Sequence, residues 1–333
     1  SNVVSLIVNL NTVINVQPTD KVECEGNTVE FTITADGTNV TYRWQSKGLG
    51  PWTNLSDGGD ISGSTSSTLT ILNVDATDEL DYRCIVSGDC GPDQTSNTVS
   101  LTVNPATAIT VQPTNQTACA NTTATFTITA TGTNITYQWQ SDAGGSWANL
   151  NNGGDISGAT SSILQINNID SNDAVNYRCI VSSDCGSDQT SNSVSLTVNP
   201  ATAITTQPTN QAECIGTTAT FTLSAVGTNL TYQWQSDAGG SWANLSNGGD
   251  ISGATSNTLQ IDNIDSNDAA NYRCIVSGDC GVDQTSNSVS LTVNPATAIT
   301  TQPTNQVDCE GSTITFTLSA VGTNLTYQWQ SDA

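Results

Sequence analysis

Ten cysteines give the clearest chemical signal in this chain of 333 residues, which contains no histidine. They recur at intervals of 95 residues, three to a repeat, with one more in a fourth, incomplete repeat. They are Cys24, Cys84, Cys90, Cys119, Cys179, Cys185, Cys214, Cys274, Cys280 and Cys309. Without histidine or a Cys-x-x-Cys pair no zinc site is expected, and repeating cysteines indicate disulfides formed in an oxidising compartment. We therefore expect a secreted protein that acts outside the cell or at the cell surface.

A tryptophan after Gly-Pro or Gly-Ser is the second candidate functional position. It recurs as Trp52, Trp147 and Trp242, with Asn and Asp residues nearby. An indole ring can stack on a sugar ring, which makes glycan contact one interpretation. Packing over the domain edge, or contact with a neighbouring copy of the chain, is the other interpretation and the favoured one.

Oxygen-rich turns and acidic pairs offer little further chemistry. Turns such as Asp57-Gly-Gly-Asp60 and Asp170-Ser-Asn-Asp173 could bind calcium, but their spacing matches no EF-hand loop. We therefore predict no cofactor, with calcium as the alternative. The absence of histidine excludes Ser-His and Cys-His pairs, and the Asp78–Asp81 pair is expected beside a strand corner with no other catalytic group nearby, so carboxylate chemistry has weak support. We predict that this segment is not an enzyme.

Charge limits the partners of the chain. Thirty acidic residues against six basic ones give a net charge of −24, which repels nucleic-acid phosphates and anionic membrane surfaces. No stretch is long and apolar enough to suggest direct membrane insertion of this segment. The partners left open are identical chains, in a homo-oligomer or fibre, and a cell-surface glycan or protein.

The repeat sets the domain organisation. Residues 9–103, 104–198 and 199–293 form three repeats without insertions, and residues 294–333 match the first strands of a fourth. Residues 1–8 match the end of each repeat, so they are expected to be the last strand of a preceding domain. Apolar residues alternate in short runs separated by Gly, Asn, Asp and Pro, which predicts an all-β fold with about seven strands per repeat. About seven strands in 95 residues indicate a β-sandwich.

The pattern of each repeat resembles that of immunoglobulin-like (Ig-like) domains. In the first repeat it consists of Val29-x-Phe31-x-Ile33, then Trp44, Leu69-x-Ile71 and Asp78-x-Leu80-x-Tyr82-x-Cys84. The resemblance implies tandem Ig-like sandwiches and assigns these segments to strands B, C, E and F. It also implies that the strand-C tryptophans and the tyrosine-corner residues lie in the core. These are Trp44, Trp139, Trp234 and Trp329, and Tyr82, Tyr177 and Tyr272.

The cysteines depart from the Ig pattern. Ile33, Ile128, Leu223 and Leu318 occupy the strand-B position where the family has a cysteine, so the usual B–F disulfide cannot form. Cysteines lie instead before the A′–B turn, on strand F and in the F–G loop. Cys-x-Gly near the start of a repeat with Cys-Gly in its F–G loop is similar to Ig-like repeats of very large secreted surface proteins of the Bacteroidota type. Those proteins include gliding adhesins and the hook-like fibres of predatory marine filamentous bacteria.

Three disulfide arrangements are consistent with this placement. The A′–B turn and the F–G loop lie at opposite ends of an Ig sandwich, about 30 Å apart, whereas a disulfide needs Cα atoms within about 7 Å. Cys24–Cys90 within one domain thus requires an altered path of the first strand. Cys24–Cys185 and Cys119–Cys280 would join successive domains, and bonds between parallel chains are the third arrangement. The strand-F cysteine is either bonded or a buried free thiol beside tryptophan.

These observations predict a mechanical role. The linkers are short and contain proline, as in Asn104-Pro-Ala-Thr107, which indicates stiff joints between domains. We expect a structural extracellular repeat segment that forms the rigid shaft of a cell-surface fibre or adhesin and assembles with identical chains. The alternative is a monomeric stalk whose Ig-like modules bind a glycan or a host protein.

Overall fold

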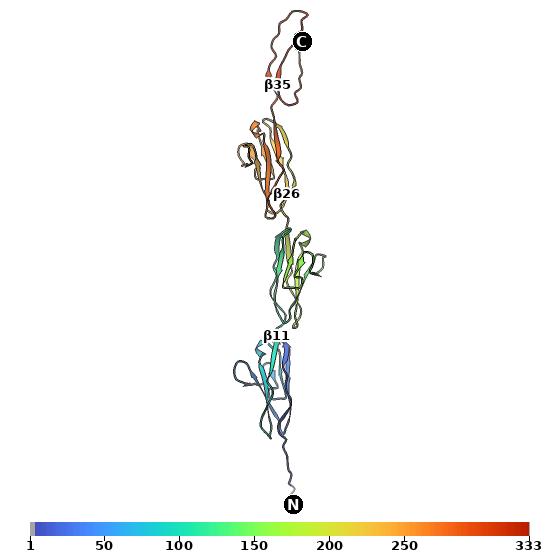
Figure 1. The fold of residues 1–333 in the computed structure, drawn as a ribbon, viewed down its shortest axis with the longest axis vertical. Coiled ribbons are helices and arrows are strands. Elements are labelled where there is room, and N and C mark those ends of the chain that lie inside the picture. The colour runs from blue at the N-terminus through green and yellow to red at the C-terminus, as the bar shows by residue number, and fades with distance from the viewer. Residues whose placement is uncertain (1–3, 333) are drawn as a thin grey trace. The chain divides into compact units, whose positions relative to one another are not determined.

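The computed structural model describes residues 4–332 and contains three complete β repeats and part of a fourth (Figure 1). The first repeat comprises β1 (Val13–Val16), β2 (Lys21–Cys24), β3 (Val29–Thr32), β4 (Thr34–Asp36), β5 (Thr41–Lys47), β6 (Thr53–Asn54), β7 (Ile61–Ser62), β8 (Thr68–Ile71), η1 (Ala76–Asp78), β9 (Asp81–Ser87), β10 (Gln94–Thr95) and β11 (Val99–Asn104). The η elements are single 3-10 turns.

The other repeats have the same element order. The second comprises β12 (Ala108–Val111), β13 (Gln116–Cys119), β14 (Ala124–Thr127), β15 (Thr129–Thr131), β16 (Thr136–Ser141), β17 (Ala148–Asn149), β18 (Ile156–Ser157), β19 (Ile163–Ile166), η2 (Ser171–Asp173), β20 (Asn176–Ser182), β21 (Gln189–Thr190) and β22 (Val194–Asn199). The third comprises β23 (Ala203–Thr206), β24 (Gln211–Cys214), β25 (Ala219–Thr222), β26 (Ser224–Val226), β27 (Thr231–Ser236), β28 (Ala243–Asn244), β29 (Ile251–Ser252), β30 (Thr258–Ile261), η3 (Ser266–Asp268), β31 (Asn271–Ser277), β32 (Gln284–Thr285) and β33 (Val289–Asn294). The fourth contains β34 (Ala298–Thr301) and β35 (Ser319–Val321).

The strands are more numerous than the expected seven per repeat because the first two are each split. Pro18 follows β1 and cannot donate a ladder hydrogen bond, so strand A ends there and resumes as strand A′, which is β2. Strand B is split between β3 and β4 at Ile33, whose N–H bonds Ser67 O at 3.0 Å instead of continuing the β4 ladder. Short edge pieces such as β6 and β7 account for the rest.

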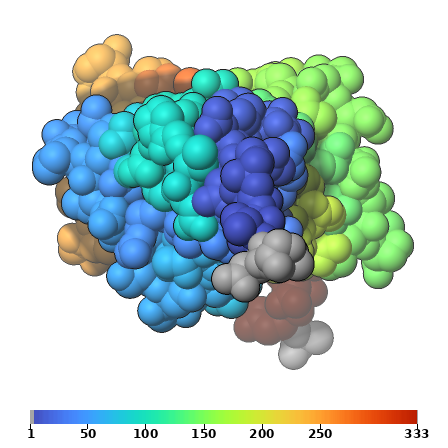
Figure 2. All heavy atoms as spheres, turned by 90° about the horizontal axis from the view of Figure 1, so that it is seen from below, coloured from blue at the N-terminus to red at the C-terminus, as the bar shows by residue number. Residues whose placement is uncertain are grey.

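Two larger sheets form each sandwich, and the first strand pairs separately with the second half of strand B, as β1 does with β4. In the first repeat one sheet has the order β2-β11-β9-β5-β6, with β10 on β9, and the other has the order β3-β8-β7. Strand β2 is parallel to β11, with Cys24 opposite Asn104, whereas the other pairs are antiparallel. Figure 2 shows the N-terminal segment that includes β2 (dark blue) against the cyan segment that includes β11. This strand order is that of an Ig-like sandwich and recurs in the next two repeats, which confirms the predicted fold class.

Aromatic side chains fill the space between the sheets. The six predicted core residues of the complete repeats are at most 3% exposed; they are Trp44, Trp139, Trp234, Tyr82, Tyr177 and Tyr272. Phe31 stacks on Tyr82 with ring centroids 5.0 Å apart. The Tyr82 hydroxyl donates to Asp78 O at 2.9 Å, and the Trp44 indole N–H donates to Ser66 O at 3.0 Å. Each ring is therefore buried with its polar atom satisfied, which burial requires.

The strand-B position confirms why the usual B–F bond is missing. Ile33 is fully buried there, and Cys84 lies opposite Trp44 in the β5–β9 pair as a buried free thiol. Cys179 and Cys274 are likewise buried and free. The strand-F cysteine was expected to be either disulfide-bonded or a buried free thiol, and the structure shows the buried free thiol.

Both ends of the chain differ from the sequence-based prediction. Residues 1–8 were expected to form a strand, but residues 4–8 form none, and residues 1–3 lie outside the described part. In the fourth repeat only β34 and β35 pair, and Trp329, expected in the core, is 51% exposed. In both places the described residues offer no further strand to pair with these segments or to cover them, so their apolar side chains stay exposed.

Candidate functional site at the joints between repeats

The first cysteine of each joint is positioned by the parallel pair at the end of a sandwich. Strand β2 ends at Cys24, and the next amide continues the pairing, since Glu25 N–H donates to Asn104 O at 2.9 Å. At the next repeat Ala120 N–H donates to Asn199 O at 2.8 Å, which places Cys119 in the same way. The cysteine is therefore held beside the residue at which the chain leaves the sandwich.

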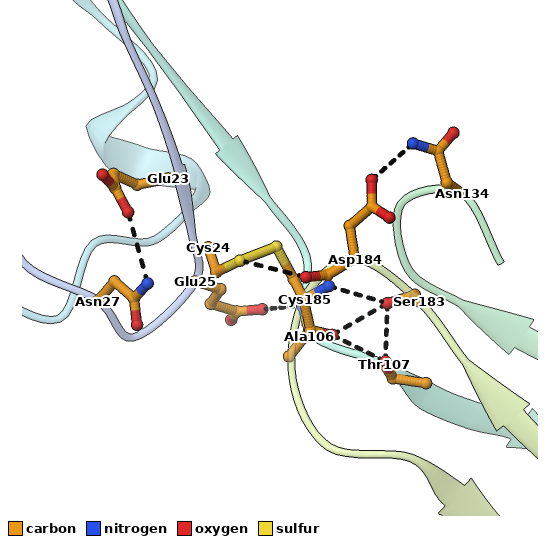
Figure 3. The surroundings of a disulfide bond; sticks show 10 residues. All are labelled: Glu23, Cys24, Glu25, Asn27, Ala106, Thr107, Asn134, Ser183, Asp184 and Cys185. Carbon is orange, nitrogen blue, oxygen red and sulfur yellow. Dashed lines mark hydrogen bonds between the residues drawn. A yellow bond between two sulfur atoms is a disulfide. The ribbon is translucent and has the colours of Figure 1, made fainter.

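The second cysteine of the joint lies in the F–G loop of the following repeat, and a neighbouring turn fixes that loop. Asp184 N–H donates to Thr133 O at 3.0 Å, and the Asn134 side-chain amide donates to the Asp184 carboxylate at 2.6 Å (Figure 3). Asn134 adopts φ 54°, a left-handed conformation that asparagine tolerates better than most residues. The loop thus presents Cys185 from a defined position.

A threonine in each linker binds the carbonyl of this second cysteine. Thr107 donates to Cys185 O through its N–H at 2.9 Å and through its hydroxyl at 2.7 Å (Figure 3). Thr202 makes the same two bonds to Cys280 O, at 2.7 and 2.8 Å. We call this pair of hydrogen bonds the threonine clamp. Because Thr107 and Thr202 are buried, losing the hydroxyl would leave less hydrogen bonding at a site shielded from water.

Two disulfides join successive repeats. Cys24 bonds Cys185 and Cys119 bonds Cys280, with Cα atoms 5.4 and 5.5 Å apart and a sequence separation of 161 residues in both cases. Of the three arrangements left open by the sequence, the structure has the bond between successive domains. An intradomain Cys24–Cys90 bond is absent because strand β2 keeps the Ig path, with Cys24 beside Asn104, while Cys90 lies beside Thr12 near the start of the same repeat.

The other exposed or partly exposed cysteines occupy equivalent positions without a partner in the described residues. Cys90 corresponds to Cys185, and Cys214 and Cys309 correspond to Cys24. The threonine clamp is present at Cys90 too, since Thr12 N–H donates to Cys90 O at 3.0 Å. The threonine clamp is therefore also present at a cysteine that has no bridge in the described residues.

The second tryptophan is covered by an arginine from strand F. The Arg83 guanidinium lies 4.3 Å from the Trp52 ring centroid, and the same stack joins Arg178 to Trp147 and Arg273 to Trp242. Arg83 Nε–H also donates to Gln45 Oε1 at 2.8 Å. One face of each indole is thus occupied within its own domain, which leaves less of the ring for a sugar or a second chain.

The candidate calcium-binding oxygens act as turn and cap acceptors. The Asp57 carboxylate accepts from Ser64 N–H at 2.8 Å, and this bond lowers the pKa of Asp57. Asp170 accepts from Asn172 N–H at 2.6 Å and caps the single turn η2. Among residues 4–332, no three His, Cys, Asp or Glu side chains are arranged to hold a metal ion.

Sequence reasoning missed the threonine clamp, the Asn134–Asp184 bond and the arginine–tryptophan stack. Each has a signal in the repeats: a threonine follows every Asn-Pro-Ala linker, and Tyr-Arg-Cys recurs on every F strand. These sequence patterns identify the positions but do not show which residues are in contact.

Comparison with known proteins agrees with this fold. Residues 13–88 and 108–183 match the immunoglobulin domain family, and residues 203–295 match a family described as a domain of unknown function. Endoglucanase C of Cellulomonas fimi is 33% identical over 160 residues, which cover 47% of this chain and 13% of that enzyme. The match therefore involves a small part of the enzyme's length.

Solved structures of tandem Ig domains are also similar. The I-band fragment I67–I69 of titin has a TM-score of 0.59 at 19% identity and covers 86% of this chain and 99% of its own. The eight N-terminal Ig domains of the Down Syndrome Cell Adhesion Molecule reach 0.53 at 19% identity, covering 85% of this chain and 36% of theirs. At these identities the likeness establishes the fold alone. No helix in the described residues is long and apolar enough to cross a membrane.

Proposed function

We propose that this segment is a structural, extracellular shaft whose repeats are locked to one another by disulfides. The observation that carries the proposal is the repeated joint, in which the last residue of strand A′ is bonded covalently to the F–G loop of the next repeat. A short, proline-containing linker limits bending, and a second covalent connection beside the linker restricts bending and twisting further. A shaft needs that restriction.

Chemistry elsewhere in the repeats supports a mechanical role over a catalytic one. Ig-like tandem repeats are typically non-enzymatic, and the Asp78 and Asp81 carboxylates lie at the edge of strand β9, where Asp78 serves as a turn acceptor. We propose that the segment has no catalytic activity and needs no cofactor. The two disulfides support a location outside the cytoplasm, and the cysteine pattern supports a secreted or cell-surface protein of the Bacteroidota type.

Assembly with identical chains is the finer part of the proposal. Near-identical repeats present the same surface at regular intervals, which suits lateral contact between copies in register. The net charge of −24 opposes such contact at low salt, and salt screens it over about 8 Å at physiological strength. A multi-chain filament is therefore expected to form in saline medium.

Electron microscopy of the purified chain, with sedimentation velocity in parallel, tests both parts. We expect straight particles that thicken into bundles as salt is raised. Thin single particles at every salt concentration would reject the filament and favour the alternative, a monomeric stalk whose modules bind a glycan or protein. Strongly bent particles with intact bridges would overturn the shaft itself.

A matched pair of variants isolates the bridge. Cys185→Ser removes the bond to Cys24, whereas Cys90→Ser changes the same loop position in a repeat where the cysteine is free. We expect a wider spread of bend angles only in Cys185→Ser. An equal spread in both variants would show that the bridge does not stiffen the joint.

A further inference from the structure

The two bridges close overlapping loops of the chain. One loop runs from Cys24 to Cys185 and the other from Cys119 to Cys280, so residues 119–185 belong to both. Strands β14 to β20, which include Trp139 and Tyr177 of the second core, lie inside this overlap. The sandwich of the second repeat is thus bypassed by two covalent connections.

Between Cys90 and Cys280 the bridge therefore provides a covalent route that is much shorter than the backbone. From Cys90 the backbone reaches Cys119 in about 29 residues, through β11, β12 and β13, and the bridge then leads directly to Cys280. Fully extended, about 29 residues span about 100 Å. The backbone between Cys90 and Cys280 has about 190 residues, which could extend to about 650 Å.

A second route of the same kind is offset by one repeat. It passes from Cys24 through the bridge to Cys185, and then along about 29 residues, which at most span about 100 Å, to Cys214. Its backbone part includes β22, β23 and β24, which are extended in the folded protein already. Little slack remains in such a segment when tension is applied.

We propose that the interleaved bridges act as an extension stop: tension applied between Cys90 and Cys280, or between Cys24 and Cys214, is borne by a covalent route of about 29 residues, so unfolding of the second sandwich releases little length between those points. This inference rests on the proposed mechanical function and adds a second property to it. A chain of Ig-like domains without such bridges lengthens each time a domain unfolds. Strands β14 to β20 lie off both of these routes, so their unfolding adds no length between Cys90 and Cys280 or between Cys24 and Cys214.

Single-molecule stretching of the full oxidised chain tests the proposal. Handles are attached through azide-bearing residues at the exposed positions Asp93 and Asp283, which flank one short route. We expect a maximum contour length of about 100 Å between the handles. A contour near 650 Å in the oxidised chain would overturn the proposal, as would non-reducing peptide mapping that lacks Cys119–Cys280.

Two variants make the test specific. Cys119→Ser opens the short route and leaves about 167 residues as the shortest connection, so the contour should rise to about 570 Å. Cys214→Ser changes the equivalent residue of the third repeat, which has no bridge, and should leave about 100 Å. Equal contours for Cys119→Ser and the unmodified chain would also overturn the proposal.

The outcome is separable from that of the shaft proposal. Bend angles in electron micrographs report stiffness at low force, whereas the contour length reports the covalent route at high force. A short contour length with flexible joints would support the extension stop and contradict the stiff shaft. A long contour length with straight particles would support the stiff shaft and contradict the extension stop.

Discussion

Buried and accessible thiols occupy chemically distinct positions in this chain. Burial raises the pKa of Cys84 and Cys274 to about 11 and that of Cys179 to about 12, because the thiolate is disfavoured away from water. Cys90 is only partly buried and Cys214 and Cys309 are exposed. Since the thiolate is the reactive form, the first three should be inert in the folded protein.

Alkylation with iodoacetamide at pH 8, followed by peptide mass spectrometry, checks this prediction. We expect Cys90, Cys214 and Cys309 to be labelled within minutes, and the three strand-F thiols to be labelled only after denaturation. Because their folded pKa lies above the ordinary value of 9.0, their contribution to stability is complete below pH 9 and is lost as pH rises through about 11 for Cys84 and Cys274 and about 12 for Cys179. Rapid labelling of Cys84 in the folded chain would contradict the prediction.

The contribution of the Thr107 hydroxyl to the joint can be tested by a single substitution. Thr107→Val keeps the shape and the backbone bond but deletes the hydroxyl bond to Cys185 O and the contact with the Ser183 hydroxyl. We expect a loss of about 0.5–1.5 kcal/mol of local stability, seen as severalfold faster reduction of Cys24–Cys185 by dithiothreitol. Thr12→Val, in the repeat whose cysteine is free, is the control and should leave that rate unchanged.

At the scale of elements, the arginine–tryptophan stack ties strand F to the segment after strand C. Arg178 lies 4.3 Å from the Trp147 ring centroid and also donates to Gln140 Oε1 on β16. Arg178→Ala removes both contacts. We expect a cost of about 1–3 kcal/mol, measured as faster hydrogen exchange in β16, β17 and β20 of the second repeat, with the third repeat unchanged.

Substitution of Trp147 distinguishes a packing role of this side chain from a role in glycan binding. If the ring serves packing, Trp147→Ala should speed exchange in the same strands as Arg178→Ala does, and sugar arrays should show no binding by either protein. Sugar binding by the unmodified chain that is lost in Trp147→Ala, with assembly intact, would instead support the ligand-binding alternative.

The joint shows how elements position chemistry that no single strand contains. Strand β2 brings Cys24 beside Asn104 because it is parallel to β11, and the Asn134–Asp184 bond sets the F–G loop that holds Cys185. These contacts lie inside one compact unit of the structure, which includes residues 123–197, and Cys119–Cys280 lies inside the other. Each bridge therefore follows from local geometry that is repeated.

For the whole molecule, we predict that calcium has no effect on stability. The acidic turns already use their oxygens as hydrogen-bond acceptors, as Asp57 does for Ser64 N–H. The midpoint of thermal unfolding should agree within about 1 °C in excess calcium and in chelator at matched ionic strength. A rise of several degrees with calcium alone, as binding to the folded state requires, would contradict the prediction.

The sequence by itself determined the periodic fold. A spacing of 95 residues, alternating apolar positions and the Trp44, Tyr82 and Cys84 pattern are local properties, and they suffice for a sandwich because its two inner faces must bury those side chains. The same reasoning showed that Ile33 excludes the usual B–F bond.

Only the tertiary structure decided where the sulfurs meet. Cys24 and Cys185 are 161 residues apart, and the sequence left open bonds inside a domain, between domains and between chains. A disulfide depends on Cα atoms within about 7 Å, and that distance depends on strand pairing and loop contacts from two repeats at once. The same holds for the Arg83 guanidinium on the Trp52 ring, because long-range packing rather than local pattern brings these side chains together.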